Sequence, residues 1–164
     1  MSIIYPSMQH MNDAAVSQRF EDSLGYLVNH LTYAFRQGIV HRCGEAGFVI
    51  THEELGVLVL LRREDGATQT HLANTLAKDK AVITRLLNGL VRKGYVERRP
   101  DPVDRRVVRA FLTTSGNGAI QCIHPILMDY VATAIRGVTQ DEFDATCVVL
   151  RRILSNLQQV NEKA

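Results

Sequence analysis

The sequence predicts a mainly α-helical protein with a small β-wing. Over most of its 164 residues, apolar side chains recur at three- and four-residue steps, which is typical of helices that bury one face. Residues 70–93 hold two such segments separated by a short turn, and two alternating segments at residues 95–112 are typical of paired strands. A helix, a tight turn, a second helix and a hairpin, in that order, make a winged helix-turn-helix with long helices on either side.

The first long helix is predicted from about Asp13 to Gly44. Apolar residues between Phe20 and Phe35 recur with helical spacing, and Gly44 supplies the break. Residues 1–12 have no periodicity and are expected to form a tail.

The second helix is predicted from His52 to Arg63. Its start is a capping box, in which the Thr51 hydroxyl accepts one free backbone amide and the Glu54 carboxylate accepts another. Asp65 and Gly66 end it. Its predicted buried residues are Leu55, Leu58, Val59 and Leu61.

Two shorter helices form the predicted helix-turn-helix. Thr68 or Thr70 caps the first of them, and Asp79 caps the second, residues 80–93. Gly94 ends the second helix at a position that favours a left-handed residue. The apolar stripe of helix 80–93 consists of Val82, Ile83, Leu86, Leu87 and Leu90.

Two strands and two long helices complete the chain. The strands are Tyr95–Arg99 and Val107–Leu112, joined by a basic loop. The next helix is predicted from Thr114 to Arg136, where Pro125 costs about 3 kcal/mol in a straight helix, so we expect a kink near His124 or a helix that begins after it.

The last helix begins at a second capping box, formed by Thr139 and Glu142, and runs to about Val160. Its apolar residues are Phe143, Cys147, Leu150, Ile153, Leu154 and Leu157.

Positive charge is concentrated on the second helix of the motif and on the wing. Residues 78–109 hold ten Lys or Arg and four Asp or Glu, a net charge of +6, whereas the whole chain carries +2 and the remainder therefore −4. A basic helix face alone is more often solvated surface, but a helix and a wing of the same sign predict a polyanion partner. Double-stranded DNA fits this pattern best.

The three cysteines are widely spaced, without a CxxC pair, which favours a reduced compartment and a cytoplasmic protein. Cys122 and Cys147 lie on apolar stripes and are expected to be buried. Cys43, beside His41 and Arg42, is the candidate for a reactive thiol, or else an ordinary partly exposed one.

Other function classes find no support in the sequence. No GxSxG, Walker or HExxH motif is present, so we expect no enzyme activity and no cofactor. In the pairs His41/Cys43 and Cys122/His124 the two residues are two positions apart, so on a helix their side chains point in different directions. We therefore predict no metal site. No apolar run is long enough to span a membrane, and no secretory signal is evident.

Residues 50–116 closely resemble the MarR family of bacterial transcriptional regulators. One matching run is LANTLAKDKAVITRLLNGLVRKG. The predicted helices on either side lie where that family has its dimerisation helices. The other match is the wing signature Asp104, Arg106, Leu112, Thr113 and Gly116.

The resemblance implies a homodimer that binds a palindromic operator and represses. It also implies release by a small phenolic or other aromatic molecule, although some members respond to cysteine oxidation and a few bind zinc. The implied organisation is an N-terminal tail and dimerisation helix at 1–48, a winged DNA-binding domain at 49–113 and C-terminal dimerisation helices at 114–164.

Helix 80–93 is the expected recognition helix in the major groove, with Arg85 on guanine and Thr84 on a base or a thymine methyl. The wing, residues 98–108, is expected in the minor groove through Arg106, with Asp104 holding that arginine or the loop. Further basic residues, Lys93, Arg98, Arg99 and Arg105, are expected on phosphates. The predicted DNA-binding residues are Thr70, Lys80, Ala81, Thr84, Arg85, Asn88, Arg98, Asp104, Arg105 and Arg106.

An effector pocket is expected between the winged lobe and the dimerisation helices. The candidates are His30, Tyr33, Arg36 and Tyr130, an arrangement suited to an anionic aromatic ring, although both tyrosines could instead pack at the dimer interface. Two other functions stay open: a winged-helix protein-interaction module and a cysteine-based redox-sensing regulator. Steep salt dependence of binding would favour DNA over a protein partner.

Overall fold

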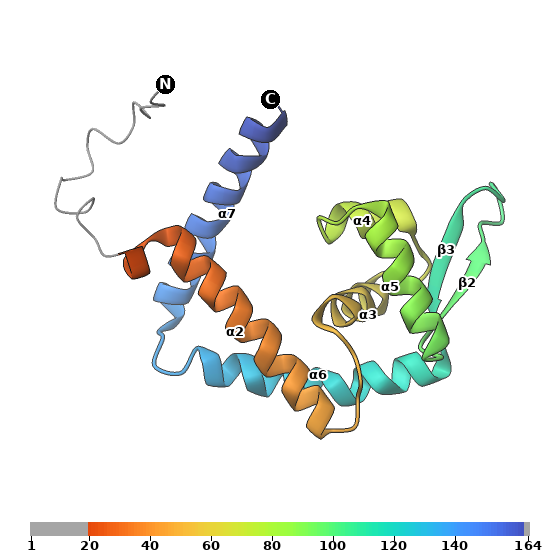
Figure 1. Cartoon of the computed structure of the whole chain (residues 1–164), viewed down its shortest axis with the longest axis horizontal. Coiled ribbons are helices and arrows are strands. Elements are labelled where there is room, and N and C mark those ends of the chain that lie inside the picture. Colours follow the sequence, from red (N-terminus) through yellow and green to blue (C-terminus); the bar gives the residue numbers. More distant parts are fainter. Residues whose placement is uncertain (1–19, 163–164) are drawn as a thin grey trace. The chain divides into compact units, whose positions relative to one another are not determined.

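The structure is a computed structural model that describes residues 20–162 (Figure 1). The predicted tail, residues 1–12, and the predicted helix start at Asp13 lie outside this part of the chain. The elements are η2 (Phe20–Asp22), α2 (Leu24–Glu45), α3 (His52–Arg63), β1 (Ala67–Thr68), α4 (Gln69–Thr75), α5 (Lys80–Arg92), β2 (Val96–Pro100), β3 (Val108–Leu112), α6 (Thr114–Ala134) and α7 (Gln140–Glu162).

The apolar spacing had predicted a first helix that runs continuously through Phe20, and this prediction was wrong. Phe20–Asp22 form a short 3₁₀ turn, and α2 begins only after Ser23. The Ser23 hydroxyl accepts a hydrogen bond from the backbone amide of Tyr26 (3.3 Å), so a capping side chain starts a new helix where apolar periodicity alone shows no break.

Helix α3 has the predicted bounds and the predicted capping box. The Thr51 hydroxyl accepts from the Glu54 amide (3.1 Å), and the Glu54 carboxylate accepts from the Thr51 amide (2.8 Å). The prediction that Val59 is buried was wrong, because Val59 is half-buried while Val57 and Leu60 are buried. Helix α3 contacts α2, α5 and β3. Because it packs on several sides, its buried residues extend beyond the single stripe that was predicted.

The turn between α4 and α5 uses an alanine in a left-handed conformation. Thr68, not Thr70, caps α4, accepting from the His71 amide (3.1 Å). After α4, Ala77 has φ +48°, a conformation that costs a residue with a Cβ roughly 1–2 kcal/mol. Asp79 occupies the N-cap position of α5, but the predicted side-chain cap is wrong, since it makes no capping hydrogen bond.

The sheet has three antiparallel strands in the order β1-β3-β2. Strand β1 was not predicted, because two residues are too few to show alternation. Thr113 donates its amide to the Tyr95 carbonyl (3.1 Å) where α6 begins. A Cβ at Gly116 would lie 2.0 Å from that same oxygen, so only glycine allows α6 to start so close to the base of β2.

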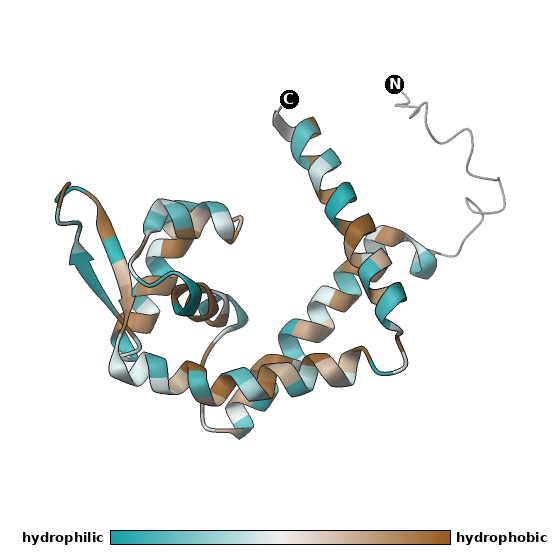
Figure 2. Cartoon of the chain, turned by 180° about the vertical axis from the view of Figure 1, so that it is seen from behind, coloured by the Kyte–Doolittle hydropathy of each residue, from teal (hydrophilic) through white to brown (hydrophobic). Residues whose placement is uncertain are grey.

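The chain forms two compact units, one ending at Ile126 and one starting at Leu127. Helix α6 passes through Pro125 without interruption, so the expected alternative of a helix beginning after the proline is wrong, and the kink near His124 stays a prediction. In the second unit, Thr139 and Glu142 form the predicted capping box. Apolar residues are interspersed with hydrophilic ones along α7 (Figure 2), and many of them are exposed.

Candidate nucleic-acid interface

Helix α5 presents the predicted polar face to solvent. Lys80, Ala81, Arg85 and Asn88 are exposed, while Ile83, Leu87 and Leu90 on the other side are completely buried. The buried stripe fixes the rotation of the helix, because turning it would expose these side chains. Thr70, in the first turn of α4, is also exposed.

The Thr84 hydroxyl is already used inside the lobe. It donates to the Lys80 carbonyl (2.8 Å) and accepts from the Gln69 amide group (3.2 Å), and the side chain is half-buried. Its proton is therefore engaged, which leaves the methyl group and one acceptor lone pair for a base.

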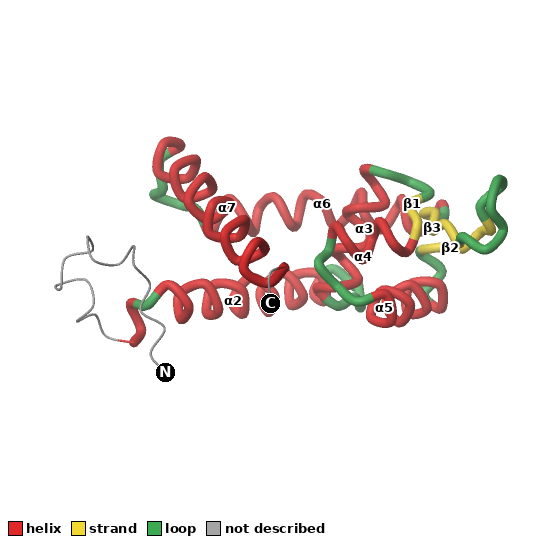
Figure 3. Tube along the Cα trace, turned by 90° about the horizontal axis from the view of Figure 1, so that it is seen from above, coloured by secondary structure: helices red, strands yellow, loops and turns green. Residues whose placement is uncertain are grey.

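The loop between β2 and β3 projects beyond the strands (Figure 3) and is organised by Asp101, a residue that the sequence analysis did not single out. One carboxylate oxygen accepts the amides of Val103 (2.8 Å) and Asp104 (3.0 Å). The other pairs with Arg109, which also donates to the Gly66 carbonyl (2.9 Å). A DPxD sequence is a signal for this side-chain-to-backbone turn and could have revealed it.

These bonds stabilise the charged form of Asp101. The backbone amide of Asp104, the Arg109 guanidinium and the amide of Val103 lower its pKa to about 2, although only 7% of the residue is exposed.

We expect the wing to stay ordered as the pH falls to about 4 and to loosen between about pH 4 and pH 2. A carboxyl whose pKa is lower in the folded than in the unfolded state stabilises the fold above its unfolded pKa, and this contribution disappears as pH falls through the folded pKa. NMR hydrogen-bond protection of the Val103 and Asp104 amides measures it. Loss of protection already at pH 5 would contradict this role, and Asp101→Asn, which cannot pair ionically with Arg109, is the control.

Asp104 holds the loop and not the guanidinium of Arg106. Its carboxylate accepts from the backbone amide of Arg106 (3.0 Å), so of the two roles predicted for Asp104 the structure shows the second. Arg105 and Arg106 are exposed, and within residues 20–162 neither side chain has a partner. The two guanidiniums therefore extend into solvent from a pre-organised loop.

Two other basic residues of the segment 78–109 already pair with carboxylates of the same chain. Lys93 pairs with the buried carboxylate of Glu54 (2.6 Å), and Arg99 pairs with Glu97 and lies over the Phe111 ring, 4.9 Å from its centroid. The predicted phosphate contacts of Lys93 and Arg99 stay predictions, and each would compete with a carboxylate.

Of the predicted effector residues, Arg36 lines two pockets in the described part of the chain. The more open one, of about 260 Å³, lies between α2 and the start of α3. The more enclosed one, of about 160 Å³, lies among α2, α3, the α4–α5 turn and α5. The Arg36 guanidinium pairs with Glu53 (3.3 Å). Burial lowers the pKa of His52, and the positive charges of Arg36 and Lys78 lower it further, while the Glu53 carboxylate raises it. The residues that line the more enclosed pocket are Arg36, His52, Glu53, Gly56, Leu76, Lys78 and Leu86.

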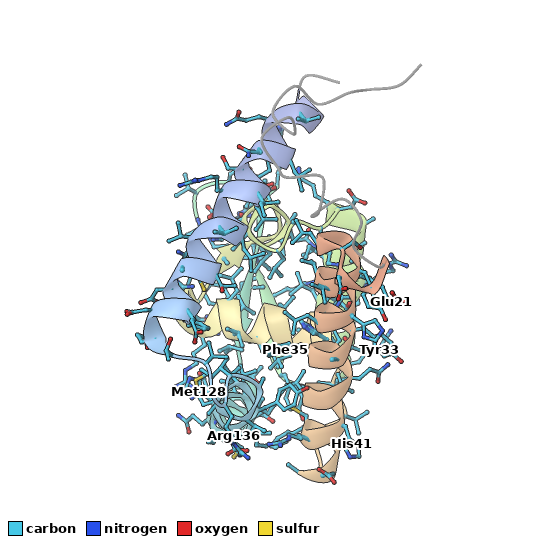
Figure 4. All side chains as sticks on the ribbon, turned by 90° about the vertical axis from the view of Figure 1, so that its left-hand side faces the viewer. Glu21, Tyr33, Phe35, His41, Met128 and Arg136 are labelled. Carbon is cyan, nitrogen blue, oxygen red and sulfur yellow. The ribbon has the colours of Figure 1, made fainter. Side chains whose placement is uncertain are left out.

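The other effector candidates are not among the residues that line either of these pockets. His30 stacks on Tyr26 of the same helix, with ring centroids 4.8 Å apart. Tyr33 is 62% exposed, on the side of α2 opposite Phe35 (Figure 4). Tyr130 belongs to the second unit.

The cysteine predictions were wrong at all three positions. Cys43 is completely buried and burial raises the pKa of its thiol, so its sequence neighbours His41 and Arg42 do not make it reactive. Cys122 is exposed, although it was expected to be buried, and Cys147 is half-buried. A helical stripe shows which residues share a face, but not whether that face is covered.

Residues 20–162 contain no cluster of three or more His, Cys, Asp or Glu that could hold a metal ion. None of the helices in this part of the chain is both long and apolar enough to cross a membrane.

Sequence comparison finds the MarR family profile over residues 50–108. The multiple antibiotic resistance protein MarR of Escherichia coli is 33% identical over 106 residues, which are 64% of this chain and 74% of that protein. The regulator TtmR of Methylorubrum extorquens is 28% identical over 149 residues, 89% of this chain and 69% of TtmR.

Solved structures give the same result. A mutant E. coli MarR complexed with operator DNA has a TM-score of 0.76 at 28% identity, over 84% of this chain and 99% of that one. The Staphylococcus aureus MepR–DNA complex has a TM-score of 0.76 at 25% identity, over 85% and 99%. Bordetella bronchiseptica BpsR, whose DNA binding is regulated by 6-hydroxynicotinic acid, shares the fold (TM-score 0.74, 20% identity, 83% and 96%).

Proposed function

This chain belongs to the MarR family of DNA-binding transcriptional regulators, and on that premise we propose that it is a homodimeric repressor of a palindromic operator. In this proposal α5 enters the major groove and the wing, residues 98–108, enters the minor groove. The observation that carries it is the outward charge of two separate elements. Lys80 and Arg85 on α5, with Arg105 and Arg106 on the wing, are exposed and have no carboxylate partner among the described residues.

Each element has its own role in the proposal. Arg85 pairs with guanine, and the Thr84 methyl contacts a base. Arg106 enters the minor groove, where the negative potential is enhanced, and Arg105 contacts a phosphate. In this proposal residues 49–113 form the DNA-binding domain. Because the proposed partner is DNA, we also propose that the protein is cytoplasmic.

The dimer is supported by apolar side chains that the single chain leaves exposed. Ten large hydrophobic residues on α2 and α7 are 38% to 60% exposed. Uncovered apolar surface of this extent is typical of an interface, and a two-fold axis matches a palindromic site. We propose on this ground that α2 and α7 take part in the dimer interface, within the segments 1–48 and 114–164 that the resemblance implies for dimerisation. The exposed residues are Leu24, Leu27, Val28, Leu31, Phe143, Val148, Val149, Leu154, Leu157 and Val160.

Genomic footprinting with the purified protein, followed by a salt titration on the recovered site, tests the proposal. We expect a two-fold symmetric footprint and a log affinity that falls linearly with log salt, by about 0.9 for each phosphate contacted. A protein-interaction module would give neither result. We do not expect oxidation of Cys43 to release the DNA, because the Cys43 sulfur is buried.

We propose further that a small aromatic acid releases the DNA by binding the pocket among α2, α3 and α5. Arg36, Lys78 and the partly buried His52 supply positive charge or hydrogen-bond donors, and Leu76 and Leu86 supply apolar walls. A cavity of about 150 Å³ accommodates one benzene ring. The corresponding behaviour of BpsR supports a ligand-responsive role for this fold.

Replacing Arg36 with methionine should abolish release by aromatic carboxylates and leave operator affinity unchanged within about threefold, because Arg36 lies outside the DNA-binding face. A panel of such acids, titrated against the protein–operator complex by fluorescence anisotropy, measures the effect. Arg63→Met, an exposed change on α3 outside the pocket, is the control. Release that persists in Arg36→Met would exclude this pocket.

A further inference from the structure

Arg98 lies on β2, at the start of the wing (residues 98–108), yet its side chain turns toward α5. We infer that Arg98 is a positioning residue, which fixes α5 against the wing, and that it does not belong to the phosphate contacts. This inference rests on the proposed function, since it concerns how the DNA-binding face is held in shape.

The hydrogen bond that carries this inference joins two elements of the interface. Arg98 sits in the middle of β2, opposite Ala110 of β3, and its Nη2 atom donates to the backbone carbonyl of Thr84 in α5 (3.1 Å). A carbonyl oxygen has two lone pairs, so that of Thr84 can accept this bond in addition to its helical one. The bond ties the wing to the second turn of α5, the helix that carries Arg85 and Asn88.

Thr84 is also bound from the other side. The Gln69 side chain, in the first turn of α4, donates to the Thr84 hydroxyl (3.2 Å), and that hydroxyl donates to the Lys80 carbonyl (2.8 Å). Gln69, Thr84 and Arg98 thus link α4, α5 and β2. A shift of α5 relative to the wing would break at least one of these bonds.

The remaining geometry of Arg98 is unfavourable for a phosphate. Its Nε atom is buried and has no hydrogen-bond partner within the described residues, and the side chain as a whole is half-buried. Side-on recognition of a phosphate needs the paired N–H groups of Nε and Nη2. In Arg98 the first is covered by protein and the second is used by Thr84, so this fork is not offered to DNA.

Charge-conserving and charge-removing variants separate the two roles. Arg98→Met and Arg98→Lys should both weaken operator binding, by about tenfold or more, because a lysine does not reproduce the planar guanidinium that reaches Thr84. In both variants the slope of log affinity against log salt should equal that of the wild type. Arg105→Met, the matched control on the wing, should lower that slope by about 0.9 for each phosphate that the variant no longer neutralises.

Gln69→Leu provides an independent test, because it removes the other link to Thr84 without changing any charge. We expect reduced affinity for the operator, a wild-type salt slope and unchanged binding to random-sequence DNA. Circular dichroism and thermal unfolding of each variant report folding, and if the Arg98 variants do not fold, Gln69→Leu decides.

The inference is overturned if Arg98→Lys keeps wild-type affinity while Arg98→Met loses both affinity and slope, which is the behaviour of a residue that binds a phosphate. Wild-type operator affinity in Gln69→Leu also overturns it. A wild-type protein whose DNA binding does not depend on salt would refute the proposed function instead, so the two failures are distinguishable.

Discussion

Replacing Arg106 with alanine should weaken operator binding by about 10- to 100-fold, which corresponds to roughly 1–3 kcal/mol for the removal of one specific arginine–DNA interaction. The guanidinium of Arg106 is exposed at the wing and has no partner among the described residues, so the free protein loses no internal interaction on its removal. The Asp104 carboxylate binds the backbone amide of residue 106 and not its side chain, so the loop should keep its shape. The loss of affinity therefore measures the interaction with DNA alone.

Fluorescence anisotropy on the footprinted site measures this change, and size-exclusion chromatography with light scattering should show an unchanged dimer. Arg63→Ala, an exposed arginine on α3 outside the wing and α5, is the matched control and should bind normally. Operator affinity that is the same in Arg106→Ala and in the wild type would remove the wing from the mechanism.

Deleting residues 139–164 should convert the dimer into monomers, with operator affinity falling by more than any single substitution at the DNA-binding face would cause. The deleted segment contains α7, on which Leu154 and Leu157 are 59% and 55% exposed. Burial of apolar area contributes about 25 cal/mol per Å², so many uncovered side chains on one helix are a large source of association energy. Each monomer then binds one half-site alone and loses the gain in affinity that comes from linking two binding modules.

Light scattering across a dilution series measures the oligomeric state. The double variant Leu154→Glu and Leu157→Glu tests the same face in the full-length chain, and a chain shortened only after Glu162 is the control. A truncated protein that remains a stable dimer would show that the interface lies elsewhere.

Features predicted well from the sequence are those fixed by neighbours in the chain. The two capping boxes, at Thr51 and Thr139, and the left-handed Gly94 (φ +73°) depend on groups within three or four residues of each other. The bounds of α3 were predicted to the residue for that reason, and those of α5, β2 and β3 to within one. Only the cap expected from Asp79 is absent.

The Ser23 cap of α2 was missed although its bond to the Tyr26 amide is local. Two other features that were missed depend on partners outside their own segment. Strand β1 has only two residues and exists because Ala67 and Thr68 pair with β3. Asp101 binds the amides of Val103 and Asp104 within its own loop, but it also pairs with Arg109, which reaches Gly66 in a distant part of the chain. None of these pairings leaves a periodic signal in the sequence.

The sequence by itself determined the order of elements and the net charge of the basic segment, because periodicity, capping and formal charge are local properties. Only the tertiary structure decided which charges face solvent and which are used internally. It directs Arg105 and Arg106 outward, turns Arg98 toward Thr84 and buries Cys43. The physical reason is that solvent exposure and ion pairing depend on which surfaces meet, and residues far apart in the chain set those surfaces.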